Sequence, residues 1–476
     1  MSAPDTFAVT NPRTGEADTR IVATDRDAMG AMAERARAAQ TEWQARGMAE
    51  RGEALMRLSN ALEAHQATIA AALEHDTGRR RIAQQEVMGV VGAMRGWAQL
   101  APTLLLESSW VQGRAKPNFK HRIDHVPYAL VGVISPWNFP MTLSFIDTIP
   151  ALMAGACVIV KPSEITPRFA DVLKSVIKDV GLEDVLQFAQ GSGITGAALV
   201  GVVDCICFTG SVETGRKVAL GCAERLIPAN LELGGKDPLI IAPGADLEAA
   251  SSLALRSSVL ATGQACQSIE RVYVPAADHD DFLDRLIAKA KEVVPNMEAV
   301  DRGQIGPFID PRQSAIVADQ IADAIAKGAI LHCGGDVMSS SGGHWMVPAV
   351  LSGVTHDMAI MIDETFGPVI PVMAYDTIEE AIALANDTAF GLSAGVFAKD
   401  LDSAAAIGSK LHAGAISLQD AALTGQYFEA EKQSFGQSGI GGSRMGAAGF
   451  SRFFRKRALI ANTVAPLELS DFAEEA

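Results

Sequence analysis

Three side chains of this 476-residue chain combine a potential nucleophile, a potential base and an amide donor. Cys266 stands in the segment TGQACQSIER, Glu232 in LELGGK and Asn138 in PWNFP. A thiolate can attack a carbonyl carbon, a carboxylate can take a proton from water, and an amide can stabilise an oxyanion. Most lone cysteines are buried and unreactive, and lone glutamates and asparagines usually serve in ion pairs and turns, so the argument depends on the combination.

A second group of residues is typical of nucleotide binding. A β-strand predicted at residues 203–208 runs into TGSVETG, where Gly210 and Gly215 precede a helix expected to begin near Arg216. Free backbone N–H groups at the start of such a helix could bind a pyrophosphate. The glycines follow a GxxxxG pattern and depart from the GxGxxG fingerprint, so this element alone indicates nucleotide binding only weakly.

Together these segments resemble the NAD(P)-dependent aldehyde dehydrogenase superfamily, from the first amphipathic helices to the strand near the C-terminus. The resemblance rests on GQxCxxxxR around Cys266, on LELGGK, on PWNFP, on FTGS at 208–211 and on ETFGP at 364–368. It implies that Cys266 adds to an aldehyde and that hydride then leaves the adduct. It also implies Glu232 as the base for hydrolysis of the thioester, and Asn138 with the Cys266 amide as oxyanion donors.

The resemblance further implies which residues hold the cofactor. Lys161 would bind a ribose hydroxyl and Glu164 the adenosine ribose, while Glu364 would hold the nicotinamide ribose and Phe366 the nicotinamide ring. A carboxylate at 164 accepts from a 2′-hydroxyl but repels a 2′-phosphate, which favours NAD and leaves NADP possible. The whole expected set is Trp137, Lys161, Ser163, Glu164, Gly210, Ser211, Gly215, Leu233, Glu364 and Phe366.

Substrate choice is expected to depend on residues that face Cys266. By resemblance these are Leu143, Ile146 and Gln267, with the helix residues near Met88–Trp97. This mainly apolar set predicts a hydrophobic or aromatic aldehyde, although Arg95 could reach in and favour a carboxylated substrate.

One segment departs from the family pattern. Relatives commonly have PFGG and then SGxGRE, whereas residues 434–445 read SFGQSGIGGSRM and lack the glutamate. A proton-relay role of that carboxylate is therefore in doubt in this chain. The stretch between Asp420 and Phe435 is expected to border the substrate mouth, and it carries Tyr427, Phe428, Glu429 and Glu431.

Four alternatives remain open at this point. The enzyme could act on a semialdehyde, or it could release the acyl group to CoA rather than to water, although Glu232 argues for water. Cys266 could instead serve as an esterase nucleophile without redox chemistry. The chain could also be a catalytically retired structural protein of the same fold, because fold alone does not fix function.

The pattern of apolar runs predicts an α/β fold. Two amphipathic helices are expected at the start, one with Met29–Trp43 and one with Leu55–Ile69, followed by strands at 129–134, 156–160, 203–208 and 238–241. A second α/β series is expected after Gly244, with a helix at 246–261, a strand at 271–274 and a helix at 282–293. The predicted domains are a Rossmann-like NAD-binding domain (1–108 and 127–235), a catalytic domain (236–433) and a small β oligomerisation element (109–126 and 455–468).

Composition limits the class of partner. The chain carries 40 basic and 56 acidic residues, a net charge of −16, which disfavours binding to nucleic acid or anionic membranes. No signal peptide, membrane span, CxxC pair or zinc spacing is evident, so we expect a cytoplasmic enzyme without a metal site. The predicted partners are an aldehyde and further copies of the chain, as a homodimer or homotetramer.

Overall fold

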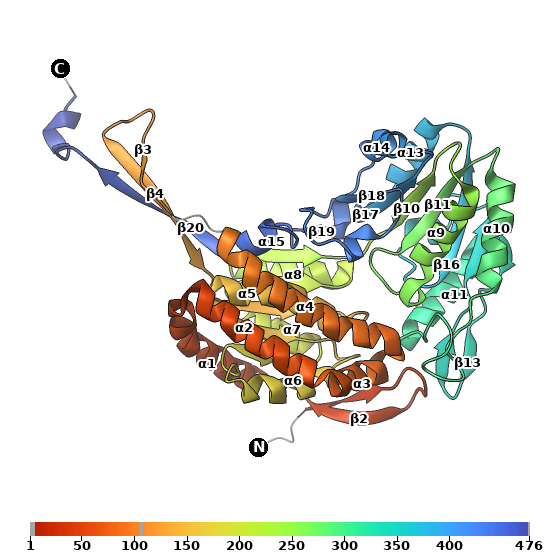
Figure 1. Cartoon of the computed structure of the whole chain (residues 1–476), viewed down its shortest axis with the longest axis horizontal. Helices are drawn as coiled ribbons and strands as arrows, with labels where there is room; N and C mark the ends of the chain where they lie inside the picture. Colours follow the sequence, from red (N-terminus) through yellow and green to blue (C-terminus); the bar gives the residue numbers. More distant parts are fainter. Residues whose placement is uncertain (1–4, 105–107, 475–476) are drawn as a thin grey trace.

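A computed structural model describes residues 5–104 and 108–474. The chain forms two α/β lobes and a projecting β arm (Figure 1). Each lobe is built on a mainly parallel sheet, and each sheet carries helices that bury its apolar side chains. The predicted α/β class with parallel sheets is therefore confirmed.

The first lobe contains a six-stranded sheet in the order β19-β9-β8-β5-β6-β7. Neighbouring strands are parallel except that β19 runs antiparallel to β9. The central strands are buried along their whole length, which explains why they read as continuous apolar runs in the sequence. The strand bounds are β5 Leu130–Ile134, β6 Cys157–Lys161, β7 Leu186–Phe188, β8 Cys205–Thr209, β9 Ala229–Glu232 and β19 Gly439–Ile440.

The helices of this lobe differ in number from the prediction. A β-hairpin of β1 (Thr6–Thr10) and β2 (Ala17–Val22) precedes the first helix. Four helices follow: the second predicted helix is divided, because α2 ends at Ala64 and Ile69 belongs to the separate helix α3, and α4 carries the residues near Met88–Trp97. The helices are α1 Arg26–Ala45, α2 Gly47–Ala64, α3 Gln66–Thr77, α4 Arg80–Leu104, α5 Pro140–Ala154, α6 Arg168–Asp179, α7 Gly193–Val200, α8 Val212–Glu224 and α15 Ala448–Ser451.

The second lobe contains a seven-stranded sheet in the order β12-β15-β16-β11-β10-β17-β18, parallel except for β12. Its strands are β10 Asp237–Ile241, β11 Ile269–Pro275, β12 Ile330–Cys333, β15 Ala349–Ser352, β16 Val369–Tyr375, β17 Ser393–Phe397 and β18 Ala415–Leu418. A small hairpin joins β13 Met338–Ser340 to β14 Gly343–Trp345. The helices are α9 Leu247–Val259, α10 His279–Lys291, α11 Pro311–Ala326, α12 Ala359–Ile362, α13 Ile378–Asn386 and α14 Leu401–Gly408. Short 3-10 turns lie at η1 Leu260–Gly263 and η2 Leu423–Gly425, at η3 Gly436–Ser438 just before β19 of the first lobe, and at η4 Leu469–Phe472 near the C-terminus.

The arm is a three-stranded antiparallel sheet that extends away from both lobes (Figure 1). It pairs β4 (Phe119–Pro127) with β3 (Val111–Gln112) on one side and with β20 (Phe454–Asn462) on the other. Several apolar side chains of this sheet and its approach are exposed, namely Trp110, Val111, Phe119 and Ile460.

The domain boundaries remain predictions, and residues 1–4 and 105–107 of the expected NAD-binding domain lie outside the described residues. Within the described residues, no helix combines the length and the apolar character needed to cross a membrane. The same part of the chain has no group of three or more His, Cys, Asp or Glu side chains placed to hold a metal ion.

Candidate active site

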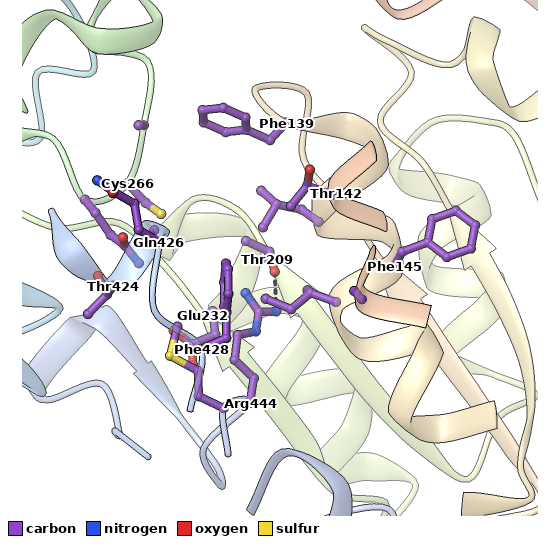
Figure 2. A pocket seen from close by; sticks show the side chains of 18 of the residues that line it. Phe139, Thr142, Phe145, Thr209, Glu232, Cys266, Thr424, Gln426, Phe428 and Arg444 are labelled. Carbon is purple, nitrogen blue, oxygen red and sulfur yellow. Dashed lines mark hydrogen bonds between the residues drawn. The ribbon is translucent and has the colours of Figure 1, made fainter. Parts of the chain in front are cut away.

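A cavity of about 1000 Å³ brings Cys266 and Glu232 to a common wall. Helices α4 and α5 form one side of it, and the loop before β11 and the segment 422–447 form another. Figure 2 shows Cys266 across the cavity from Phe139 and Thr142, with Glu232, Phe428 and Arg444 grouped together at another part of the wall. Two of the three predicted catalytic residues therefore line the same cavity.

A sharp turn presents Cys266 to this cavity. Ala261, Thr262 and Gly263 all have positive φ angles of 56°, 62° and 67°, so the chain reverses direction just before the cysteine. A Cβ atom on Gly263 would lie 2.2 Å from the carbonyl oxygen of Gly367, so only glycine fits there. Such costly backbone conformations persist where the surrounding structure holds them, commonly at functional sites.

The side chain of Gln264 anchors this turn to the neighbouring segment 307–309. Its side-chain Nε2 donates to the carbonyl oxygen of Pro307 at 3.0 Å, and its Oε1 accepts from the backbone N–H of Ile309 at 2.9 Å. Because Gln264 is fully buried, these bonds hold the backbone two residues before Cys266 in one position.

Burial controls the ionisation of the Cys266 thiol. Desolvation is the largest cause of a pKa raised to about 12, to which the nearby acidic groups of Asp237, Glu364 and Glu232 also contribute, while the charge of Lys432 acts in the opposite direction. The thiol is therefore protonated at neutral pH, and it needs a positive charge or a base to become a nucleophile.

Glu232 ends strand β9 and is ionised. It lies opposite Gly439 of β19, and its Oε2 accepts from Ser434 Oγ at 2.9 Å and lies 3.3 Å from Lys432 Nζ. Burial alone would raise the pKa of this carboxyl, but the charges of Lys432 and Arg444 hold it below its usual value. The carboxylate is therefore unprotonated at neutral pH and free to accept a proton, while its lowered pKa makes it a weaker base than a carboxylate without these cations.

Asn138 is buried beside the nucleophile segment but does not line the cavity. Its Nδ2 donates to the carbonyl oxygen of Gln264 at 3.1 Å, which leaves one amide N–H for another acceptor. Its Oδ1 accepts no hydrogen bond from the described residues. The structure thus links Asn138 to the Cys266 segment, and its role as oxyanion donor remains a prediction.

The predicted pyrophosphate and ribose residues lie at or just after the carboxyl ends of β8 and β6, which flank β5 in the sheet. Lys161 ends β6, and its Nζ lies 2.9 Å from Glu164 Oε2, whose side chain is 43% exposed. Ser211 caps α8 by accepting from the Thr214 N–H at 3.3 Å, so this helix begins at Val212, four residues earlier than predicted. Crevices at the carboxyl ends of parallel strands are the usual ligand sites of such sheets, so these residues fit a dinucleotide.

Glycines allow close approaches within the predicted cofactor site. A Cβ on Gly215 would lie 2.5 Å from the Leu233 side chain, and a Cβ on Gly234 would lie 2.6 Å from both carboxyl oxygens of Glu364. Helix α8 and the ETFGP loop can therefore lie directly against the LELGGK segment only because these positions lack side chains. Gly210 precedes the Ser211 cap, and Ser163 is buried, with its Oγ accepting from the Ile165 N–H at 3.2 Å.

The ETFGP loop reaches the same region from the second lobe. The rings of Trp137 and Phe366 meet edge to face with centroids 5.3 Å apart, and Glu364 accepts from the Gly235 N–H at 3.1 Å. Burial and the neighbouring Glu270 raise the pKa of Glu364 to about 8. Its carboxyl is therefore mostly protonated at neutral pH in the free protein.

Sequence reasoning missed the residues that hold the ETFGP loop. Glu270 accepts from the backbone N–H groups of Thr365 and Phe366, each at 2.8 Å, and pairs with Lys236 at 2.8 Å. Lys236 belongs to the LELGGK motif and Glu270 to the segment around Cys266. The ETFGP loop that they contact lies about a hundred residues later in the sequence, so no local pattern indicates the contact.

Two further residues that were not predicted lie in helix α4 and immediately before it. Glu86 lines the cavity, and its Oε2 accepts from the backbone N–H groups of Met141 and Thr142 at 3.0 and 2.9 Å, at the start of α5. Arg79, immediately before α4, donates to the backbone carbonyl of Asn138. The two side chains hold the PWNFP segment at its middle residue and just after its last residue.

The substrate predictions can be compared with the cavity wall directly. Leu143, Ile146 and Gln267 all line it, as do Trp97, Phe428 and Glu429, whereas Met88 does not. Arg95 pairs with Glu63 of α2 at 2.6 Å and is absent from the wall. The cations on the wall are instead Arg256, Lys432 and Arg444, which the sequence did not single out.

Comparison with known proteins agrees with this geometry. The aldehyde dehydrogenase family model matches residues 1–459. A solved structure titled putative aldehyde dehydrogenase PutA, from Anabaena variabilis, is 47% identical and covers 98% of this chain and 99% of its own, with a TM-score of 0.95. Lactaldehyde dehydrogenase from Escherichia coli is 30% identical over 97% of each chain, with a TM-score of 0.91.

Among curated relatives, a putative succinate-semialdehyde dehydrogenase [NADP(+)] from Mycolicibacterium smegmatis is 36% identical and covers 95% of this chain and 88% of its own length. The chain therefore belongs to the aldehyde dehydrogenase family, and the prediction of an NAD(P)-dependent enzyme of that family is confirmed.

Proposed function

We propose that this enzyme oxidises a hydrophobic or aromatic aldehyde to its carboxylic acid with NAD, through a covalent adduct on Cys266. The observation that carries the proposal is that Cys266 and an ionised, buried Glu232 line the same cavity. A nucleophile and a base at one cavity are what addition to an aldehyde and later hydrolysis of a thioester require.

In the first half of the reaction, the Cys266 thiol loses its proton to solvent, the thiolate sulfur forms a bond to the aldehyde carbon, and the carbonyl oxygen becomes an oxyanion. The free amide N–H of Asn138 and the backbone N–H of Cys266 are suited to stabilise that charge. The carbon–hydrogen bond then breaks, and bound NAD supplies the hydride acceptor. The adduct is left as a thioester of Cys266.

In the second half, Glu232 takes a proton from water while the water oxygen bonds to the thioester carbon. The carbon–sulfur bond then breaks, which releases the carboxylic acid and returns the sulfur of Cys266. The overall balance is aldehyde, NAD and water in, and acid, NADH and a proton out. Release to CoA is the competing course, and NADH formation without CoA distinguishes the two.

A direct test replaces the nucleophile. Cys266→Ser is expected to lose aldehyde-dependent NADH formation by more than about a thousandfold, because serine is not ionised by this environment. Retention of oxidation at the original rate would refute the proposal. Ester hydrolysis by the unmodified enzyme, with no NADH formed from any aldehyde, would instead identify a thiol esterase.

NAD preference is supported by Glu164, whose carboxylate lies at the end of β6 and is partly exposed. Its negative charge disfavours a 2′-phosphate, although the Lys161 ammonium at 2.9 Å offsets part of that repulsion. Measuring kcat/KM with NAD and NADP for the enzyme and for Glu164→Gln tests the assignment. A smaller preference for NAD in the variant is expected, and an unchanged ratio contradicts it.

The substrate proposal is supported by the apolar part of the cavity wall, which includes Trp97, Phe139, Leu143, Ile146 and Phe428. A semialdehyde is the second candidate, because Lys432 and Arg444 place positive charge on the wall and the Mycolicibacterium relative is named for such a substrate. Lys432, however, faces Glu232, and Arg444 pairs with Asp147 at 2.7 Å. A higher kcat/KM for benzaldehyde than for succinic semialdehyde is expected, and the reverse order favours the second candidate.

Assembly into a homodimer or homotetramer and a cytoplasmic location also remain proposals. The arm of β3, β4 and β20 supports the first, since it projects from the lobes and exposes apolar side chains. Edge strands of this kind commonly pair with another chain.

A further inference from the structure

A buried cation lies two residues before the segment that departs from the family pattern. Lys432 lies in the stretch before β19, and its side chain is 4% exposed. Its Nζ lies 3.3 Å from Glu232 Oε2, and the Glu232 side chain is 12% exposed. A lysine so thoroughly removed from water needs a charged partner, and Glu232 is the acidic group within ion-pairing distance in the described part of the chain.

The backbone around Lys432 fixes this contact. Gly439 pairs with Glu232 across β19 and β9, which brings the preceding residues over the carboxylate. The Lys432 N–H donates to Ser443 Oγ at 3.1 Å, and Ser434 Oγ donates to the same Glu232 oxygen at 2.9 Å. The base therefore receives an ammonium and a hydroxyl from one short segment.

The same ammonium acts on the nucleophile. Lys432 and Cys266 line one cavity, and the Lys432 charge lowers the pKa of the thiol against the effects of burial and of three carboxylates. Those carboxylates are Asp237, Glu364 and Glu232. Around Glu232, the other charged groups are Arg444 and Arg452, both paired with Asp147.

We propose that Lys432 is a positioning residue that keeps Glu232 ionised and oriented in the resting enzyme, and that it supplies the positive charge that favours the Cys266 thiolate. The role deepens the proposed function, on which it rests, by naming the group that prepares both the nucleophile and the base. No proton has to pass through Lys432 for this, because its effect is electrostatic and geometric.

The test compares three variants. Lys432→Met removes the charge and keeps the length of the side chain, Lys432→Arg keeps the charge, and Ser434→Ala removes only the hydroxyl bond to Glu232. Lys174→Met is the matched control, since Lys174 forms an exposed ion pair with Asp171 at 3.1 Å on α6. Lys432→Gln gives a second neutral variant if the methionine variant does not fold.

The first readout is the rate at which iodoacetamide alkylates Cys266, followed against pH without aldehyde or NAD. We expect the neutral variants to be alkylated several-fold more slowly at pH 7, because each unit of increase in the thiol pKa costs about tenfold in thiolate. Lys432→Arg, Ser434→Ala and Lys174→Met are expected to keep the original profile. If Lys432→Met or Lys432→Gln folds and shows the same pH dependence of Cys266 alkylation as the unmodified enzyme, Lys432 does not favour the thiolate.

The second readout is the acidic limb of kcat. Without Lys432, less positive charge offsets the burial of Glu232, so the pKa of Glu232 rises and the acidic limb of kcat moves to higher pH. Lys432→Arg, which keeps the charge, should leave the limb at its original position. An unmoved limb would overturn the role toward the base. Because alkylation needs no turnover, a shifted alkylation profile in a protein that oxidises no aldehyde would refute the proposed function and leave the electrostatic role of Lys432 standing.

Discussion

Burial raises the pKa of the Cys266 thiol to about 12, so the resting nucleophile is almost entirely protonated at neutral pH. Alkylation of the free enzyme should therefore accelerate about tenfold for each pH unit between pH 7 and 10, without a plateau. The sign follows from the raised pKa, since thiolate forms only as pH approaches it. A plateau near pH 8, measured with iodoacetamide, would show that the thiol is ionised more easily than its surroundings indicate.

Glu232 gives a second prediction for a single side chain. Glu232→Gln keeps the hydrogen bond from Ser434 possible but cannot accept a proton, so hydrolysis of the thioester should slow about a hundredfold or more. A single NADH burst, equal in amount to the enzyme, should then precede slow turnover in a stopped-flow assay. Steady turnover at the original rate, without a burst, would show that another group activates the water.

The turn before Cys266 yields a prediction at the scale of an element. Gly263 and Gly181 have similar φ angles of 67° and 70°, but a Cβ would strike the Gly367 carbonyl at 2.2 Å in the first and meet nothing within 4 Å in the second. Gly181→Ala should cost only about 1–2 kcal/mol of unfolding free energy. Gly263→Ala should cost more and should also lower kcat/KM, because the turn carrying Cys266 must move.

Urea unfolding and aldehyde oxidation measured on both glycine variants separate these effects. Equal losses of stability, with full activity in both, would show that the turn adapts without displacing the nucleophile. The Gly181 variant, located at the end of α6 and outside the cavity wall, controls for the backbone conformation itself.

The sequence predicted the elements whose neighbours are continuous along the chain. Strands β5, β6, β8 and β10 are buried throughout and mainly apolar because helices cover them, and their predicted bounds agree with the structure within a few residues. The break at His65 was missed because Leu62 and Ile69 keep a helical spacing across it. Periodicity records which face is buried and does not record where one helix stops and another begins.

The residues of the candidate active site also divide into those that motifs predicted and those that only the tertiary structure reveals. Cys266, Glu232 and the lining residues Leu143, Ile146 and Gln267 were named from motifs, and the structure brings all five to one cavity. Lys432 and Glu86 were missed because their contacts depend on tertiary structure: Lys432 meets a residue 200 positions earlier, and Glu86 meets the start of α5. No local pattern distinguishes them from solvated charges.

The arm gives a prediction for the whole molecule. Ile460 of β20 is 70% exposed, which is unfavourable for an apolar side chain unless another subunit covers it. Ile460→Glu should lower the oligomeric mass measured by light scattering, while Leu401→Glu, at an exposed position on α14, should not. An unchanged mass in the Ile460 variant would place the subunit contact elsewhere.

The antiparallel addition of β19 to β9 has a consequence for biosynthesis. The ribosome completes the whole second lobe before it makes Lys432, Ser434 and β19, which then return to the first lobe. A nascent or truncated chain that stops before residue 432 would carry the thiol and the carboxylate without the segment that covers them. Such a chain would lack the ammonium of Lys432 and the hydroxyl of Ser434 at Glu232, which are supplied only by the last tenth of the sequence.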